Sequence, residues 1–147
     1  MKVQVQIEPF DLNAEVAALQ TAGVGAVASF VGVVRDDGEG LAALTLEHYP
    51  GMTERALERI LVRARERWGF IDATIIHRVG ELAPGEPIVL VAVAAAHRGE
   101  AFAACEFIMD YLKTEAPFWK KEFGEAGARW VDARVSDQAA AARWGGP

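Results

Sequence analysis

The apolar run from Ile88 to Ala96 constrains the fold more than any other segment of this 147-residue chain. The run is much shorter than the ~20 residues that a membrane-spanning helix needs. Apolar side chains occupy both of its faces, which is typical of a strand that other elements cover on each side. It therefore predicts a buried strand inside a globular core.

The rest of the chain alternates between strand-like and helix-like patterns. Period-two alternation predicts strands, and apolar residues at i, i+3 and i+4 spacing predict helices. Further strands are expected at Val3–Ile7, Ala26–Arg35, Leu41–Tyr49, Ala73–Val79, Phe118–Phe123 and Ala128–Val135, and helices at Asp11–Ala22, Thr53–Trp68 and Glu100–Thr114. The pattern predicts a single α+β domain over residues 1–147. We expect a mixed or antiparallel sheet with helices packed on it, a small β-hairpin subdomain and a tail over 136–147.

Single residues indicate where the elements begin and end. Thr53 is of a type that caps helix N-termini. Pro117 disfavours a helical conformation for the residue before it, so the last long helix should end near Glu115. The segment Ala83–Glu86 has Pro and Gly at the two central positions of a type II turn.

Charge and cysteine content exclude several classes of function. The formal net charge is −6, whereas a general nucleic-acid-binding protein needs a broad basic surface. One cysteine, Cys105, allows no internal disulfide and fits a reducing compartment, so we expect a cytoplasmic protein. The histidines and the cysteine are not at metal-ligand spacing, and we predict neither a metal site nor a cofactor.

Cys105 is the obvious candidate for a sulfur-carrying group. It lies on the apolar stripe of the Glu100–Thr114 helix, a position that favours an inert, buried thiol. If the protein handles sulfur, the sulfur must therefore arrive on a partner.

Several basic residues are predicted at the ends of elements: Arg35, His97, Arg98, Lys113, Lys120 and Lys121. The sequence His97-Arg98-Gly99 lies where the buried strand meets a helix, so unpaired backbone N–H groups, an imidazole and a guanidinium could bind a phosphate or carboxylate. The alternatives are that such residues serve solubility and the helix dipole, or that the arginine pairs with a nearby carboxylate.

The lysines near Pro117 form a second candidate site. Lys113 falls in the last turn of its helix, where the negative end of the helix dipole favours the ammonium form. Lys120 and Lys121 alternate along a strand, so only one of them can face a given pocket. Periodicity leaves open which one it is.

Two other functions are compatible with parts of the pattern. A small oligomeric module that senses or stores an anionic metabolite would explain His97 and Arg98, but it would not require both lysines. An acid–base hydrolase could use Glu47 and His48, although adjacent strand residues point to opposite faces.

Seven short strings, taken in order and spacing, resemble the large subunit of molybdopterin synthase, the MoaE family. They are distributed from the second predicted strand to the start of the tail. The strings are Phe30–Arg35, Leu46–Met52, His77–Leu82, Ala96–Arg98, Phe107–Thr114, Ala116–Glu122 and Ser136–Gln138.

The resemblance implies a sulfurtransferase of molybdenum cofactor biosynthesis with the fold of that family. A small ubiquitin-like partner would bring sulfur as a thiocarboxylate on its C-terminal glycine. Two transfers to cyclic pyranopterin monophosphate would yield molybdopterin. The implied assembly is a homodimer with one small subunit at each end, a heterotetramer.

The resemblance also implies roles for individual residues. Lys113 and Lys120 match the two catalytic lysines, and Arg35, His97, Arg98, Lys121 and Glu122 match substrate-binding positions. Preorganised cations suit anionic reactants whose charge develops further in the transition state. Lys113 either acts as a charged clamp or reacts as a neutral amine; the sequence leaves both open. Val33 stands where many relatives carry a lysine, so a side-chain contact is not expected there.

Overall fold

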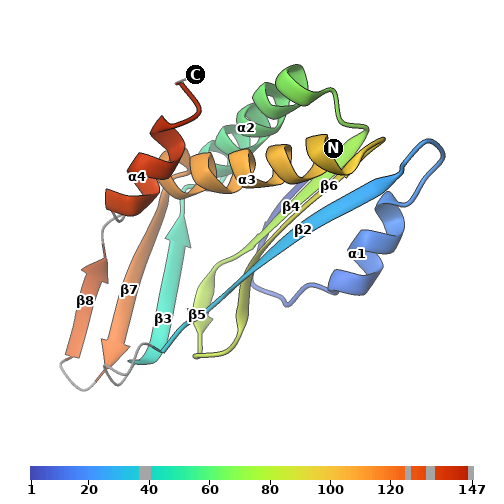
Figure 1. Ribbon diagram of the computed structural model, residues 1–147. Coiled ribbons are helices and arrows are strands. Elements are labelled where there is room, and N and C mark those ends of the chain that lie inside the picture. Colours follow the sequence, from blue (N-terminus) through green and yellow to red (C-terminus); the bar gives the residue numbers. More distant parts are fainter. Residues whose placement is uncertain (37–40, 125–126, 132–134, 146–147) are drawn as a thin grey trace.

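The computed structural model describes residues 1–36, 41–124, 127–131 and 135–145. Within these residues, eight strands form two four-stranded sheets, and four helices pack around them (Figure 1). This arrangement confirms the predicted α+β class. None of the helices in these ranges has the length and apolar character needed to cross a bilayer.

The first sheet, sheet A, has the strand order β1-β4-β6-β2. Strand β1 (Lys2–Gln6) runs parallel to β4 (Asp72–Arg78), whereas β6 (Pro87–Ala95) pairs antiparallel with β4 and with β2 (Ala26–Val33). Strand β6 is thus internal to a mixed sheet, and every residue from Val89 to Ala95 is buried. The apolar run is therefore buried on both faces over Val89–Ala95, as the sequence predicts, whereas Ala96 at its end is exposed.

Helices cover both faces of sheet A (Figure 1). On one face α2 (Met52–Trp68) and α3 (Arg98–Glu115) bury their apolar stripes against Ile75, Val89 and Val91. On the other face α1 (Leu12–Leu19) packs through Leu19 on Ile76 and Leu90. Alternate residues of β4 therefore point toward different helices, which determines the surroundings of His77 below.

The second sheet, sheet B, is antiparallel, in the order β5-β3-β7-β8. Its strands are β5 (Gly80–Leu82), β3 (Leu41–His48), β7 (Phe118–Gly124) and β8 (Gly127–Val131). The predicted hairpin of β7 and β8 is present, but it belongs to this larger sheet. Strand β8 ends at Val131 rather than at Val135, where a helix begins. The three-residue β5 was not predicted, because such a short strand depends on its partner β3.

The start of α2 differs from the prediction that Thr53 caps it. The cap is Gly51, whose N–H donates to Glu54 Oε1 at 2.9 Å. Thr53 lies inside the helix and is fully buried. Its hydroxyl accepts from the Tyr49 N–H and donates to the Pro117 carbonyl, each at 3.0 Å. Thr53 therefore joins the end of β3 and the first turn of α2 to the residue that precedes β7.

The tail contains a helix that the sequence pattern did not predict. Helix α4 (Val135–Ala142) packs on α3, and Ala141 is buried. Beyond α4, the Trp144 ring packs edge-on against Trp68 and Phe107, and its indole N–H donates to Asp110 Oδ2 at 2.7 Å. Residues 135–145 are thus part of the packed structure.

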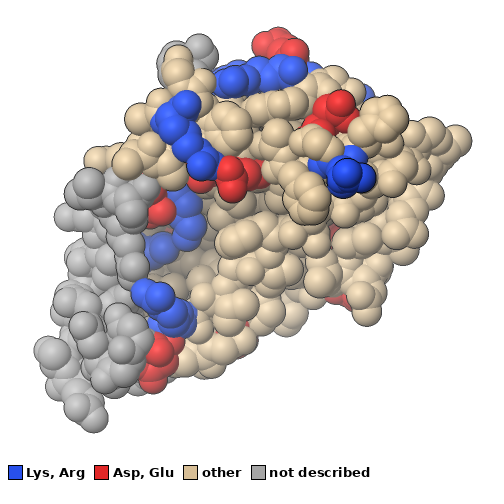
Figure 2. All heavy atoms as spheres, viewed as in Figure 1, with Lys and Arg blue, Asp and Glu red and all other residues tan. Residues whose placement is uncertain are grey.

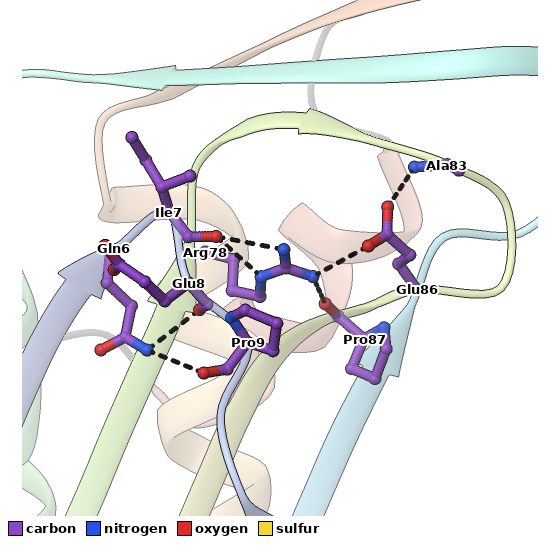
Figure 3. Close-up of polar contacts among 8 residues, drawn as sticks. All are labelled: Gln6, Ile7, Glu8, Pro9, Arg78, Ala83, Glu86 and Pro87. Atoms are coloured by element: carbon purple, nitrogen blue, oxygen red, sulfur yellow. Dashed lines mark hydrogen bonds and ion pairs between the residues drawn. The ribbon is translucent and has the colours of Figure 1, made fainter.

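Arg78 fixes the end of β4 (Figure 3). Its guanidinium donates to the Ile7 carbonyl through Nε and Nη2 and to the Pro87 carbonyl through Nη1, each at 3.1 Å. Glu86 lies 3.5 Å from the same group. The N–H groups of this buried arginine are thus paired with backbone carbonyls, and the side chain joins β4 to the segments at Ile7 and Pro87. These bonds also restrict the backbone at His77, the residue before Arg78.

Candidate active site

A stacked pair of rings joins the two sheets. His77 of β4 lies on the face of sheet A that α2 and α3 cover, in line with the buried residues Ala73 and Ile75. Its imidazole stacks on the Phe118 ring of β7, with centroids 3.9 Å apart and planes 20° apart. His77 Nδ1 lies 2.8 Å from the Arg78 carbonyl, so this nitrogen carries a proton and donates it.

Both predicted catalytic lysines act electrostatically on His77. The pKa of His77 is lowered to about 3, chiefly because burial disfavours the imidazolium. The hydrogen bond to the Arg78 carbonyl opposes this shift, while the charges of Lys113, Lys120 and His48 add to it. Lys113 comes from the last turn of α3 and Lys120 from β7, so lysines from two different elements both act on one buried, neutral imidazole.

The register of β3 and β7 assigns Lys120 to a face of sheet B. Phe118 lies opposite His48 and Lys120 lies opposite Leu46, which is almost completely buried. Directly opposed residues of an antiparallel pair share a face. Lys120 therefore lies on the face that carries the ring stack. Lys121 and Glu122 pair through their backbones with Thr45 and Leu44, and their side chains lie outside the described part of the structure.

Basic side chains lie beside a hollow in the surface. Figure 2 shows Lys and Arg side chains, with some Asp and Glu side chains among them, beside a hollow below the helical layer. Lys113 is exposed and Lys120 is half-buried. Two ammonium groups beside a neutral, buried ring can bind an anion, and a partly desolvated position strengthens that attraction.

His97 and Arg98 lie at a separate place, at the start of α3. Together with Gly25, Ala26, Ala96 and Gly99 they line a pocket of about 540 Å³. His97 is the N-cap residue of α3, but its side chain does not cap the helix. A β-carbon on Gly25 would lie 2.2 Å from the Ala96 carbonyl oxygen, so only glycine allows this close approach of the two segments.

One chain does not bring the two groups of basic residues together. Helix α3 is continuous from Arg98 to Glu115. Fifteen residues of helix rise ~22 Å, which separates Arg98 from Lys113 by more than the size of a small pterin phosphate. Arg35 is exposed just after β2, and none of the contacts found for the described residues joins it to either lysine. Val33 is also exposed, and residues 37–40 lie outside the described part of the chain.

The buried thiol is confirmed. Cys105 is 7% exposed in the α3 stripe, and burial raises its pKa to about 12, with a further contribution from Glu106. Glu47 lies opposite Trp119 whereas His48 lies opposite Phe118, so these two residues occupy opposite faces of β3. That placement gives no support to an acid–base pair.

His77 and Phe118 belong to the site, although neither is among the residues predicted for it from the sequence. No local spacing could identify them, because they lie 41 positions apart and meet only where sheet A approaches sheet B. The one available indication was that each begins or lies within a string shared with the MoaE family.

Comparison with known proteins agrees with this structure. The family model described as MoaE protein matches residues 5–115. A Ralstonia nicotianae protein named molybdopterin synthase catalytic subunit is 65% identical, over 97% of this chain and 84% of its own length. The solved structure of the molybdopterin biosynthesis MoaE protein from Burkholderia ambifaria is 59% identical, with a TM-score of 0.86 and complete coverage of both chains.

A more distant structure shares the fold. It is described as a protein–protein complex of subunits 1 and 2 of molybdopterin-converting factor from Helicobacter pylori. Its matched chain is 20% identical to this one, and the match covers 90% of both chains with a TM-score of 0.73. The extent of the family match and the identity to its members lead to one conclusion: the chain belongs to the MoaE family, whose members compared above include molybdopterin synthase catalytic subunits.

Proposed function

We propose that this chain is the catalytic subunit of a molybdopterin synthase that transfers sulfur to cyclic pyranopterin monophosphate. The sulfur comes from the C-terminal thiocarboxylate of a small ubiquitin-like partner, and two transfers form the dithiolene of molybdopterin. One observation carries the proposal: Lys113 and Lys120, which lie 36 and 43 positions after His77 in the sequence, both act electrostatically on it, in a chain that belongs to the MoaE family.

The lysines are the catalytic residues in this proposal. A thiocarboxylate and a cyclic phosphate are both anions, and opening of the phosphate ring develops further negative charge. Ammonium groups fixed near the reacting atoms stabilise that charge most where water is excluded. Lys121 and Glu122 continue the same strand and are proposed to bind substrate.

Sulfur delivered by a partner fits the state of the only cysteine. A thiol with a pKa of about 12 is protonated at neutral pH and is a poor nucleophile. We call the region of Lys113, Lys120 and His77 the lysine site. The partner's extended C-terminal tail is proposed to enter this site. A reducing cytoplasm suits both a free cysteine and a thiocarboxylate, so we place the reaction there.

The substrate anion is proposed to bind at His97 and Arg98 of a second copy of the chain. The length of α3 prevents one copy from bringing these residues to Lys113. A twofold axis can place them beside Arg35, Lys113 and Lys120 of the other copy. The assembly is then a homodimer with one small subunit at each lysine site. Residues 1–147 act as one catalytic domain in which α4 and Trp144 are packed against α3.

The decisive experiment combines the purified chain, a thiocarboxylated small subunit and cyclic pyranopterin monophosphate. Molybdopterin formation that depends on all three components supports the proposal. If authentic components give no product while the chain still binds the pterin, a metabolite-binding module becomes the better interpretation.

A further inference from the structure

His77 is a buried titratable group for which the proposed mechanism has no role so far. It is 5% exposed, it lies in a strand at the base of the lysine site, and its ring touches the strand that carries Lys120. A polar ring in such a position costs free energy unless it is satisfied, and a leucine or phenylalanine would fill the space without that cost. A histidine at this buried position therefore needs a physical explanation.

The orientation of the ring is fixed from two sides. Phe118 packs against one face, and the Arg78 carbonyl accepts the Nδ1 proton at 2.8 Å. Arg78 is itself held by the Ile7 and Pro87 carbonyls, so its backbone cannot easily shift (Figure 3). His77 is therefore a rigid part of sheet A rather than an adaptable side chain.

The tautomer follows from this geometry. In a neutral imidazole one nitrogen carries the proton and the other has a lone pair. Because Nδ1 donates to the Arg78 carbonyl, Nε2 is a hydrogen-bond acceptor. It lies on the far side of the ring from the backbone.

Within the described residues, the charged groups that act on the pKa of the ring are basic. Lys113 approaches from α3, Lys120 from β7 and His48 from β3, while the Arg78 side chain is held on the other face of β4. An acceptor nitrogen among cations is well placed to receive an ammonium N–H. Of the two lysines, Lys113 exerts the larger electrostatic effect on His77.

We propose that His77 is a positioning residue of the lysine site, and that its Nε2 accepts a hydrogen bond from the Lys113 ammonium when substrate is bound. The exposed Lys113 side chain would then fold over the site with its charge directed at the anion. The ring also holds Phe118, and with it the part of β7 that carries Lys120. This role rests on the proposed sulfur-transfer function.

Two substitutions separate this role from a structural one. Asn at position 77 can replace Nδ1 as the donor to the Arg78 carbonyl, but it does not reach the position of Nε2. Gln reaches that position with an amide oxygen, but it loses the donor near the backbone. The positioning role predicts that His77→Gln keeps more activity than His77→Asn, with kcat in the Asn variant reduced at least ~10-fold and KM changed little.

Equal kcat in the two variants, or higher kcat in His77→Asn, would overturn the proposal. Thermal unfolding of both variants checks that each one is folded.

A second measurement does not depend on turnover or on any variant. Long-range 15N–1H spectra of the histidine-labelled wild-type protein should show His77 as the Nδ1–H tautomer, unchanged between pH 8 and pH 5. An Nε2–H tautomer or an imidazolium would overturn the proposal. Failure of the wild-type protein to form molybdopterin would instead count against the sulfur-transfer function and would leave this spectrum unaffected.

Discussion

The hydroxyl of Thr53 donates to the Pro117 carbonyl at 3.0 Å and thereby links the first turn of α2 to the residue before β7. The two residues are 64 positions apart, and Pro117 is three positions before Lys120. Because the same hydroxyl accepts from the Tyr49 N–H, it also fixes the end of β3, the strand that pairs with β7. The position of Lys120 therefore depends on a buried hydroxyl in a different element.

Thr53→Val should destabilise the protein and reduce its activity. Valine has the same shape but leaves the Tyr49 N–H and the Pro117 carbonyl without this partner, at a cost of about 1–3 kcal/mol. Thr53→Ser is the matched control, because it keeps the hydroxyl and loses one methyl group, worth about 0.8 kcal/mol. Urea unfolding and the sulfur-transfer rate measure the two effects. A valine variant as stable as the serine variant would show that the hydrogen bonds contribute little.

Substitution of the lysines should affect catalysis rather than folding. Loss of one preorganised cation from a site of this kind typically reduces kcat by about 100-fold or more, which is our expectation for Lys113→Ala and Lys120→Ala. Lys121→Ala should lose less activity than Lys120→Ala, since adjacent strand residues alternate in face. Single-turnover rates and thermal unfolding separate activity from stability. Equal loss of activity at positions 120 and 121 would contradict the assignment of Lys120 to the face that carries Phe118.

Cys105 should be unreactive and dispensable. Burial raises its pKa to about 12, so labelling by iodoacetamide at pH 8 should be slow in the folded protein and fast in urea. Cys105→Ala should keep sulfur transfer and lose only about 1–2 kcal/mol of stability from the removed buried atom. Mass spectrometry of the protein during turnover provides the critical check. A persulfide on Cys105 would exclude the model in which the partner alone carries the sulfur.

The buried neutral state of His77 should make folding sensitive to acid. The pKa of His77 is about 3 in the folded protein and near 6.5 in an unfolded chain, so between these values only the unfolded state binds the proton. The free energy of unfolding should therefore fall as pH decreases through this interval, by up to ~1.4 kcal/mol per pH unit. His77→Gln should lack this component, although it will be less stable at pH 7. Urea unfolding of both proteins from pH 7 to pH 4 measures the difference, and parallel curves would refute the prediction.

The proposed shared site can be tested by complementation. Arg98→Ala and Lys113→Ala should each be inactive as pure proteins. After subunit exchange, a mixed dimer would contain one site with both residues intact, because each copy contributes one group to each site. Native mass spectrometry establishes whether exchange has occurred, and molybdopterin formation measures the recovery. Exchange without recovery would show that the two groups do not act on the same substrate molecule.

The sequence by itself determined the features that depend on local pattern. The burial of β6, the apolar stripes of α2 and α3, the end of α3 before Pro117 and the inert position of Cys105 all follow from periodicity or from the properties of single residues. The order and spacing of short strings determined the family.

Only the tertiary structure decided which groups meet. Alternation along β7 puts Lys120 and Lys121 on different faces of the strand, but it does not say which face the rest of the molecule covers. The pairing of Lys120 with the buried Leu46 shows that it is the face of Lys120. His77 becomes part of the lysine site only because sheet B packs Phe118 against it. Thr53 is of a residue type that caps helices, yet it binds Pro117, a partner 64 residues away. The physical reason is the same in each case. Local sequence fixes dihedral preferences and the faces of an element, whereas the pairing of distant segments depends on how the whole core packs.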